Sequence, residues 1–384
     1  MQDRTRLIAG ATRKPSARRA VNPPVTRATT LLNARAADLR DDTLGPVYGI
    51  EGLEAHQALA EALADMEGAH AVELFPTGLA AVTVALLALV RPGDEILATD
   101  ACYGPTRRFL DRRLPHFGVT TRYHAPRATS GEIAAMIGDK TRVLFMESPG
   151  TATFEVQDVP GLAALARDRG LVSVVDNTWA AGLLFRPLAH SADVCVQALS
   201  KYVGGHSDVF GGAIACRTAE NARAVATTIE DLGLFVSPDD AWLMLRGLRT
   251  LPVRVAEHGR NALRVAEWLQ DRPEVARVLY PPLPSSPDHD LWKRDFRGGS
   301  GLMGVVLKGA TAAQAEAFLD ALRLFGLGFS WGGFESLATF ENAQLAVRTA
   351  PPAFDGALIR LHIGLEAPED LIADLDQAFG AIQP

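Results

Sequence analysis

The chain has 384 residues and contains little cysteine, which excludes two classes of protein. Cys102, Cys195 and Cys216 are its cysteines, and no two of them form a Cys-x-x-Cys pair. An odd and sparse set is incompatible with a disulfide scaffold or a zinc site built from thiolates. We therefore expect a protein of a reducing compartment, cytoplasmic and without a metal centre.

A strong excess of charge of one sign is also lacking. Lys and Arg number 38 and Asp and Glu 45, so the formal net charge is −7 and the pI is near 5.8. This balance provides no bulk electrostatic attraction to nucleic acid or to an anionic membrane. We expect a small-molecule substrate, with no nucleic acid or membrane as partner.

Long hydrophobic runs are missing as well. The longest strongly apolar run, residues 80–90, is broken by Thr83 and is too short to span a bilayer. The N-terminus is basic but lacks the apolar stretch of a secretory signal. An organellar transit segment and an exposed arm both fit it, and the arm is favoured. Its basic residues are Arg4, Arg6, Arg13, Lys14, Arg18 and Arg19.

The length predicts two or three domains at roughly 150 residues each. Prolines interrupt residues 1–47, which we interpret as an N-terminal arm. Residues 48–247 are predicted to form a large α/β domain, and residues 248–384 a smaller α+β domain.

Short apolar runs alternate with helical patterns in the large domain. This alternation predicts a buried parallel or mixed sheet. The expected strands are 71–75, 95–99, 143–146, 171–175 and 194–198, with helices at 79–90 and 159–169. The smaller domain is expected to contain helices 253–269, 312–324 and 370–379 and strands 304–307 and 358–363.

In such a sheet, ligands bind beyond the carboxyl ends of the strands, and three features stand there. A turn ending in Gly78 and Leu79 opens a helix, whose free N–H groups suit a phosphate. Asp176 ends a strand, and Ser200-Lys201 follows another. When each feature is considered alone, the simpler interpretation of Gly78-Leu79 is an ordinary turn, and that of Lys201 is a surface lysine. Asp176 fits equally well as a turn cap or as a ligand.

Together the three features meet the needs of pyridoxal phosphate. This cofactor requires a lysine for a Schiff base, a carboxylate that keeps the pyridine nitrogen protonated, and an anion cradle. Tyr103, just after strand 95–99, offers a ring to stack on the pyridine; the alternative is a half-buried core aromatic.

The sequence resembles the Cys/Met-metabolism group of pyridoxal phosphate enzymes, and within it the cystathionine β-lyases. The most specific segments are Asp176-Asn177-Thr178-Trp179-Ala180-Ala181-Gly182 and Ile359-Arg360-Leu361-His362-Ile363-Gly364-Leu365. Further matches are Tyr48-Gly49, Glu147-Ser148-Pro149-Gly150, Ser200-Lys201-Tyr202 and Gly205-His206-Ser207-Asp208. The resemblance implies the aspartate-aminotransferase fold, known as fold type I, and a homotetramer with active sites at dimer interfaces.

The resemblance also implies residue roles. Lys201 carries the cofactor and moves protons, Asp176 pairs with the pyridinium, and Tyr103 stacks on the ring. Gly78, Leu79 and Ser200 hold the phosphate. Arg360 binds the substrate carboxylate, Ser330 and Trp331 line the pocket, and Tyr48 arrives from a neighbouring subunit.

Two positions depart from the family pattern, and a third indicates the reaction. Ile50 stands where an arginine usually contacts the cofactor phosphate, and Glu51 replaces a residue that is often basic near the distal end of the substrate. Phe329 precedes Ser330, where the γ-synthases and γ-lyases typically carry glutamate. With Trp331, this favours β-elimination from a sulfur amino acid.

Three alternatives remain at this point. A γ-synthase, γ-lyase or sulfhydrylase would use the same scaffold. A dinucleotide-binding oxidoreductase would leave Lys201 unexplained and lacks a glycine fingerprint. A non-catalytic regulatory relative is the third alternative. Ile50 supports it, whereas the intact Lys201, Asp176 and Arg360 argue against it.

Overall fold

The computed structural model describes residues 3–9 and 20–382. The basic residues Arg13, Lys14, Arg18 and Arg19 lie outside the described residues. Helix α1 (Asp3–Ala9) packs against α2 (Glu54–Glu67) and α8 (Pro238–Gln270), with Leu7 buried. We interpreted these residues as part of an arm and did not expect α1 to pack against the large domain.

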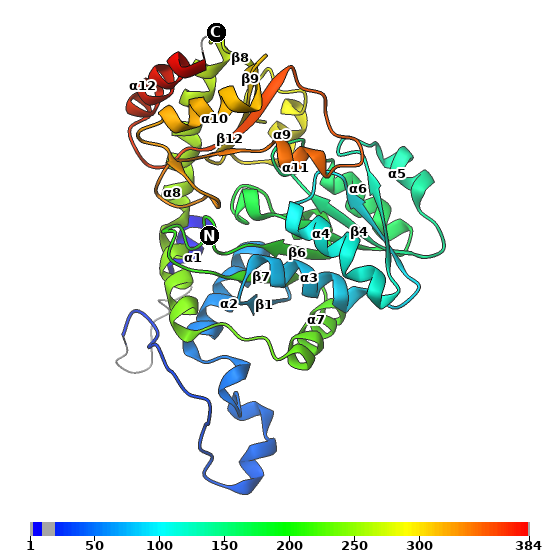
Figure 1. Cartoon of the computed structure of the whole chain (residues 1–384). Helices are drawn as coiled ribbons and strands as arrows, with labels where there is room; N and C mark the ends of the chain where they lie inside the picture. Colours follow the sequence, from blue (N-terminus) through cyan, green and yellow to red (C-terminus); the bar gives the residue numbers. More distant parts are fainter. Residues whose placement is uncertain (1–2, 10–19, 383–384) are drawn as a thin grey trace.

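A mixed sheet of seven strands forms the centre of the large domain (Figure 1). Its order is β1-β7-β6-β5-β4-β2-β3; β7 is antiparallel to both of its neighbours, and the other neighbouring pairs are parallel. The carboxyl ends of the parallel strands therefore meet at one edge. The strands are β1 (Ala71–Phe75), β2 (Glu95–Thr99), β3 (Thr120–His124), β4 (Thr141–Glu147), β5 (Val172–Asp176), β6 (Val194–Gln197) and β7 (Gly212–Cys216).

Helices cover both faces of this sheet, because its strands are apolar on both sides. Phe145 packs into the cluster on the face of α3 (Gly78–Leu89), α4 (Gly104–Arg112) and α7 (Ala219–Leu232). Its neighbours Leu144 and Met146 join the opposite cluster, with α2, α5 (Ser130–Met136), α6 (Val159–Asp168) and α8. The alternation confirms a buried sheet with helices on two sides.

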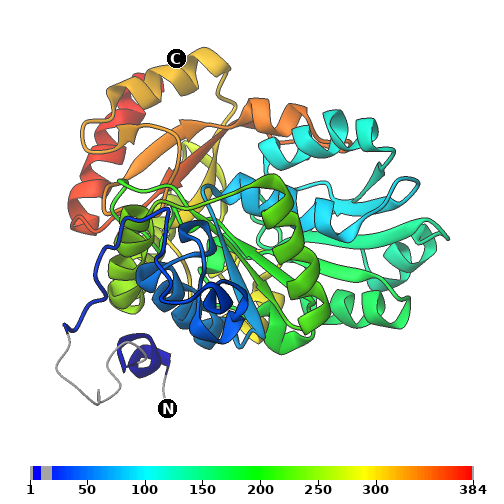
Figure 2. The same ribbon diagram turned by 90° about the horizontal axis from the view of Figure 1, so that it is seen from below.

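A second sheet, of order β10-β11-β12-β9-β8, lies in the C-terminal part. Figure 2 shows this part, in yellow to red, beside the large sheet. Its elements are β8 (Val275–Leu279), α9 (His289–Asp295), β9 (Leu302–Lys308), α10 (Ala312–Ala321), β10 (Gly326–Leu327), β11 (Leu337–Phe340), α11 (Asn342–Ala346), β12 (Gly356–His362) and α12 (Pro368–Phe379).

Helix α8 connects the two sheets and is longer than the sequence predicted. Its 33 residues span about 50 Å at 1.5 Å per residue. We expected a helix only from residue 253, yet α8 continues through Pro252, although proline in a helix removes a backbone hydrogen bond. Arg254 supports this turn by donating 2.7 Å hydrogen bonds to the carbonyls of Gly247 and Tyr202. The predicted domain boundary at 247/248 falls inside α8 and remains a prediction.

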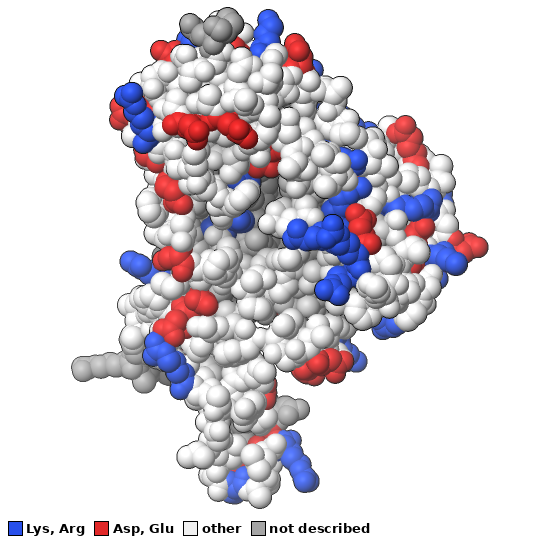
Figure 3. Space-filling view, viewed as in Figure 1, with Lys and Arg blue, Asp and Glu red and all other residues white. Residues whose placement is uncertain are grey.

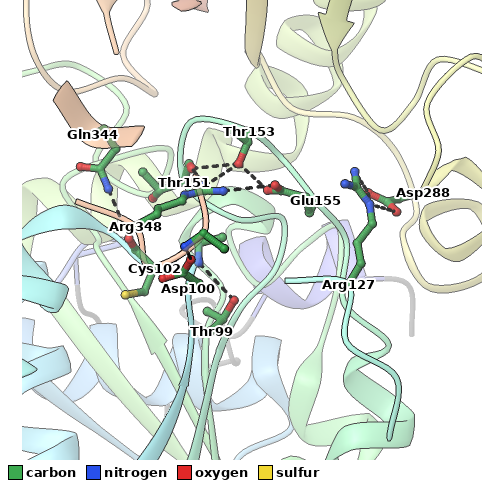
Figure 4. A network of polar contacts seen from close by, with 12 residues as sticks. Thr99, Asp100, Cys102, Arg127, Thr151, Thr153, Glu155, Asp288, Gln344 and Arg348 are labelled. Carbon is green, nitrogen blue, oxygen red and sulfur yellow. Dashed lines mark hydrogen bonds and ion pairs between the residues drawn. The ribbon is translucent and has the colours of Figure 1, made fainter. Parts of the chain in front are cut away.

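Residues 342–350 cross from the second sheet onto the large domain (Figure 4). Arg348 is buried there; its guanidinium contacts Glu155 Oε1 at 3.2 Å, the Thr151 carbonyl at 2.8 Å, and Thr153 Oγ1. Asp100 accepts the backbone N–H groups of residues 349 and 350, each at 2.9 Å. This segment therefore joins the two parts of the molecule through buried polar contacts.

We predict that Arg348→Met lowers the free energy of unfolding by about 3 kcal/mol. The substitution leaves the buried Glu155 carboxylate without its cation, and breaking one partner of a buried pair is costly. Chemical denaturation measures the effect. The double variant Arg348→Met/Glu155→Met serves as the control and should recover part of the loss. A loss below about 1 kcal/mol in the single variant would contradict the assignment.

Candidate active site

The candidate site lies where β4, β5 and β6 end. Glu147 and Asp176 are the last residues of β4 and β5 and are partners in the parallel register. After β6 the chain turns directly into Ser200 and Lys201. The pairing thus gathers two carboxyl groups and one amine at a single sheet edge.

Lys201 lies between the two parts of the molecule. Its Nζ donates to Ser330 Oγ at 2.8 Å and lies 5.3 Å from the centre of the Trp331 ring. Burial lowers the lysine pKa to about 8; the cation of Arg360 adds to this shift and the Asp176 carboxylate opposes it. A substantial fraction of the amine is therefore unprotonated near pH 8, as a nucleophile or base requires.

Asp176 is oriented by the turn that follows it. Its Oδ1 accepts from the Thr178 backbone N–H at 3.1 Å and from the Thr178 hydroxyl at 2.6 Å. That hydroxyl oxygen also accepts the Ala198 N–H at 2.9 Å, which connects Asp176 to the segment leading to Lys201. Burial raises the pKa of Asp176, and nearby Lys201 opposes the shift.

The start of α3 lies beside these groups and presents backbone N–H groups. Thr77 caps the helix by accepting the Ala80 N–H at 3.0 Å, and the N–H groups of Gly78 and Leu79 have no acceptor within the helix. A Cβ at Gly78 would lie only 2.4 Å from the Cβ of Ala198, so glycine allows α3 to approach this segment.

Ser200, which we expected beside the phosphate, is bonded within its own loop. Its hydroxyl donates to the Gly211 carbonyl at 3.2 Å and accepts the Gly211 N–H at 2.9 Å. The hydroxyl thus fixes the turn before Lys201. Its contact with a phosphate remains a prediction.

Tyr103 stands at the start of α4. Its backbone N–H donates to Glu147 Oε2 at 2.7 Å, while its side chain remains 45% exposed. Burial first, and then the Glu147 carboxyl, raise the pKa of the phenol, and the cations of Arg360 and, more weakly, Arg108 act in the opposite direction. The residue is therefore fixed at its backbone while its side chain remains accessible to solvent.

The C-terminal part supplies the opposite wall. Arg360 on β12 donates to the Ser330 carbonyl at 3.1 Å, and its guanidinium lies 3.5 Å from Glu341 Oε1. Ser330 holds a left-handed backbone with φ of 80°. This geometry directs the Ser330 hydroxyl toward Lys201 and its carbonyl toward Arg360, so one residue connects both cations. Phe329, just before it, is 88% exposed.

His362 and Glu147 also lie at the site, although we assigned neither a role from the sequence alone. His362 lies two residues after Arg360 on β12, hence on the same face, and its Nε2 accepts the Gly332 N–H at 3.0 Å. Burial lowers its pKa to about 3, so the ring is neutral. The two-residue spacing from Arg360 could have predicted that His362 lies at the site. The position of Glu147 at the end of a strand could have predicted the same for that residue.

Tyr48, Ile50 and Glu51 directly follow the arm. The segment of residues 20–51 extends away from the large sheet within one chain, as the blue part of Figure 1 shows. Tyr48 is 50% exposed. Glu51 folds back on the arm and accepts the N–H groups of Val47 at 3.2 Å and Tyr48 at 3.1 Å. Both carboxylate oxygens are therefore engaged locally. A role for Tyr48 in another subunit remains a prediction.

The face containing the site is hollowed and basic at one rim. Figure 3 shows Lys and Arg side chains gathered beside a hollow, over the region where Figure 1 places α4. Arg108 on α4 acts on the Tyr103 phenol and is a candidate for this rim. Among the described residues, no cluster of His, Cys, Asp and Glu could hold a metal ion, and no helix is long and apolar enough to cross a membrane.

The residues present fit pyridoxal phosphate. Lys201 provides an amine whose pKa is near neutrality, Asp176 provides a buried carboxylate, and the first N–H groups of α3 provide an anion site. Tyr103 provides an aromatic ring at the entrance. These are the groups that bind and tune this cofactor in proteins.

Comparisons with known proteins agree with this fit. The cystathionine beta-lyase of Bordetella avium is 42% identical over 366 residues, covering 93% of this chain and 91% of its own. That of Escherichia coli is 40% identical and covers 98% of both chains. The crystal structure of metB from Corynebacterium glutamicum, 31% identical, superimposes with a TM-score of 0.93 over 100% of this chain and 99% of its own.

The model of one protein family, the Cys/Met metabolism PLP-dependent enzymes, matches residues 4–380. The fold expected from the sequence is confirmed by the solved relative and by this match, as is the expected cofactor class. This chain therefore belongs to the family of pyridoxal phosphate-dependent enzymes of Cys/Met metabolism.

Proposed function

We propose that this enzyme is a carbon–sulfur β-lyase that cleaves cystathionine or another cysteine S-conjugate to a thiol, pyruvate and ammonia. One observation carries the proposal: Lys201, Ser330 and Arg360 form a chain of contacts whose lysine has a pKa of about 8. The two cystathionine β-lyases at 40–42% identity support the reaction, and Phe329 before Ser330 supports β- over γ-elimination.

Each group has a task in this proposal. The cofactor, when bound, supplies an electron sink for the charge that develops at Cα. Asp176 stabilises the positive charge that such a sink needs, and Lys201 Nζ takes the Cα proton. Arg360 holds the α-carboxylate, and Ser330 keeps the amine of Lys201 in place between proton transfers.

The oligomer belongs to the proposal as well. We propose a homotetramer, a dimer of dimers, in which the arm reaches the site of a neighbouring copy. Leu32 on the arm is 95% exposed and Tyr48, directly after it, is 50% exposed in the single chain. Apolar surface of this kind is typical of interfaces rather than of free surface.

A substrate panel tests the reaction. With cystathionine, β-elimination releases pyruvate and homocysteine, whereas γ-elimination releases 2-oxobutyrate and cysteine. We expect pyruvate from cystathionine, cystine and S-methylcysteine, and a rate lower by about 10²- to 10⁴-fold for Lys201→Ala as the control. Release of 2-oxobutyrate as the main keto acid would overturn the β-lyase assignment in favour of a γ-lyase.

We expect Arg360→Ala to raise the KM for cystathionine by on the order of 10²-fold. Loss of a charge-assisted, two-pronged contact with a buried carboxylate costs about 3 kcal/mol, which corresponds to this factor. Arg360→Lys is the matched control and should recover part of the loss, because it keeps the charge but not the fork. Unchanged saturation curves for both variants would assign carboxylate binding to another residue.

We expected Glu51 near the distal end of the substrate, with a position at the start of the following helix, where an acid complements the helix dipole, as the alternative. Because both oxygens of Glu51 accept backbone N–H groups, we expect Glu51→Arg to change kcat/KM by the same factor for cystathionine and for S-methylcysteine. Only cystathionine carries distal charges, so the ratio of the two values isolates electrostatics. A ratio that changes by about tenfold or more would return Glu51 to the pocket.

A further inference from the structure

Glu147 is a buried carboxyl group in contact with the site but without a role in the proposed reaction. It is 8% exposed at the end of β4. Its Oε2 accepts the backbone N–H of Tyr103 at 2.7 Å, and its Oε1 is bonded to the hydroxyl of Thr151. The contact with Tyr103 spans 44 residues of sequence and fixes the point from which the tyrosine side chain departs.

The surroundings of Glu147 are poor in compensating cations. Asp176 is its partner on the adjacent strand, and the described structure contains no ion pair to Glu147. Arg348 is the cation that lowers the pKa of Glu147. Its guanidinium, however, is bonded to Glu155, the Thr151 carbonyl and Thr153. Glu147 is thus a buried acid beside another buried acid.

Two adjacent buried carboxyls do not both ionise readily, because like charges repel and burial penalises each charge. Both carboxyls accept two hydrogen bonds, but the negative charge is better stabilised on Asp176, because Asp176 also interacts with Lys201. Burial first, and then Asp176, raise the pKa of Glu147 to about 8. Thr151, Tyr103 and Arg348 act in the opposite direction, and Cys102 is the remaining titratable neighbour.

We propose that Glu147 is a positioning residue for the cofactor: its protonated carboxyl fixes Tyr103 through the backbone N–H and leaves the negative charge of the sheet edge on Asp176. The carbonyl oxygen of the neutral Glu147 carboxyl accepts the Tyr103 N–H as an amide oxygen would. The hydroxyl group of the same carboxyl forms a hydrogen bond with the Thr151 oxygen. The proposal rests on the proposed function only in placing Tyr103 and Asp176 against pyridoxal phosphate.

Two substitutions separate the acceptor from the charge. Glu147→Gln keeps the acceptor and mimics the neutral acid, whereas Glu147→Met keeps the volume and removes the acceptor. We expect Glu147→Met to raise the Kd for pyridoxal phosphate by about tenfold or more and to shift the visible absorbance and circular dichroism of the bound cofactor. Glu147→Gln should stay within about threefold and keep the spectrum. A Gln variant as damaged as the Met variant would show that a carboxylate anion is required, and an unaffected Met variant would remove the positioning role.

A double-mutant cycle tests whether Glu147 acts through Tyr103. In a Tyr103→Ala background, Glu147→Met should weaken cofactor binding by less than about twofold, because the ring that it positions is gone. An undiminished effect in that background would mean that Glu147 acts on Asp176 alone and would overturn the proposed route.

The pH dependence of stability tests the proton on Glu147, with Glu67→Gln as the matched control. In the cofactor-free protein, a carboxyl with a raised pKa binds its proton in the folded state while the unfolded chain releases it. Stability therefore falls as pH rises from about 4.5 to about 8. Glu147→Gln should remove the contribution of one titrating group to this decrease of stability with pH, which thermal unfolding at several pH values measures. An unchanged slope would show that Glu147 is ionised throughout.

Glu67 is also buried, and burial raises its pKa to about 7, but the cation that opposes this shift is Arg186 and its hydrogen-bond partners are Cys195 and Gln197. Glu67→Gln should change the slope of stability with pH without changing cofactor affinity or the spectrum. A loss of affinity equal to that of Glu147→Met would attribute the effect to general core damage. If the wild-type enzyme binds the cofactor but releases no pyruvate, the proposed function fails while these binding measurements still decide the role of Glu147.

Discussion

The parallel pairing of β4, β5 and β6 is the constraint on which the site depends. Strands that run the same way end at the same edge, so the groups that follow them must share a small space whatever their charge. Here that space receives Glu147, Asp176 and Lys201. The energetic problem that results is the burial of ionisable groups, and burial is the first cause of the pKa shift of all three.

The second sheet completes the site rather than adding a separate one. The loop before β11 brings Ser330 and Trp331 to Lys201, and β12 aims Arg360 and His362 at that same loop. Glycine is required at Gly332, where φ is 88° and a Cβ would lie 2.8 Å from the Tyr202 nitrogen. The wall of the site is thus built by close backbone contact between the two parts of the chain, reinforced by the buried polar contacts of residues 342–350.

Local patterns predicted the fold well where a residue's environment follows from its neighbours in sequence. The strands at 71–75 and 95–99 match β1 and β2, because five-residue apolar runs bounded by turns have few other solutions. Strand β7 and helix α4 were not predicted. The run of small residues in β7 and the arginines of α4 give weak local signals, and both elements owe their stability to tertiary packing. Helix α8 continues through Pro252 for the same reason.

The sequence by itself determined the chemical inventory: a lysine and an acid at strand ends, a glycine turn opening a helix, and an arginine in a C-terminal strand. Those identities follow from residue type and position, which local rules can interpret. Only the tertiary structure decided which of these groups touch, that Glu51 caps its own arm and Ser200 its own loop, and that Glu147 shares its edge with Asp176. The contacts that build the site, such as Glu147 with Tyr103 and Lys201 with Ser330, join residues tens to hundreds of positions apart. Their burial sets the protonation states, because desolvation depends on the whole surrounding fold.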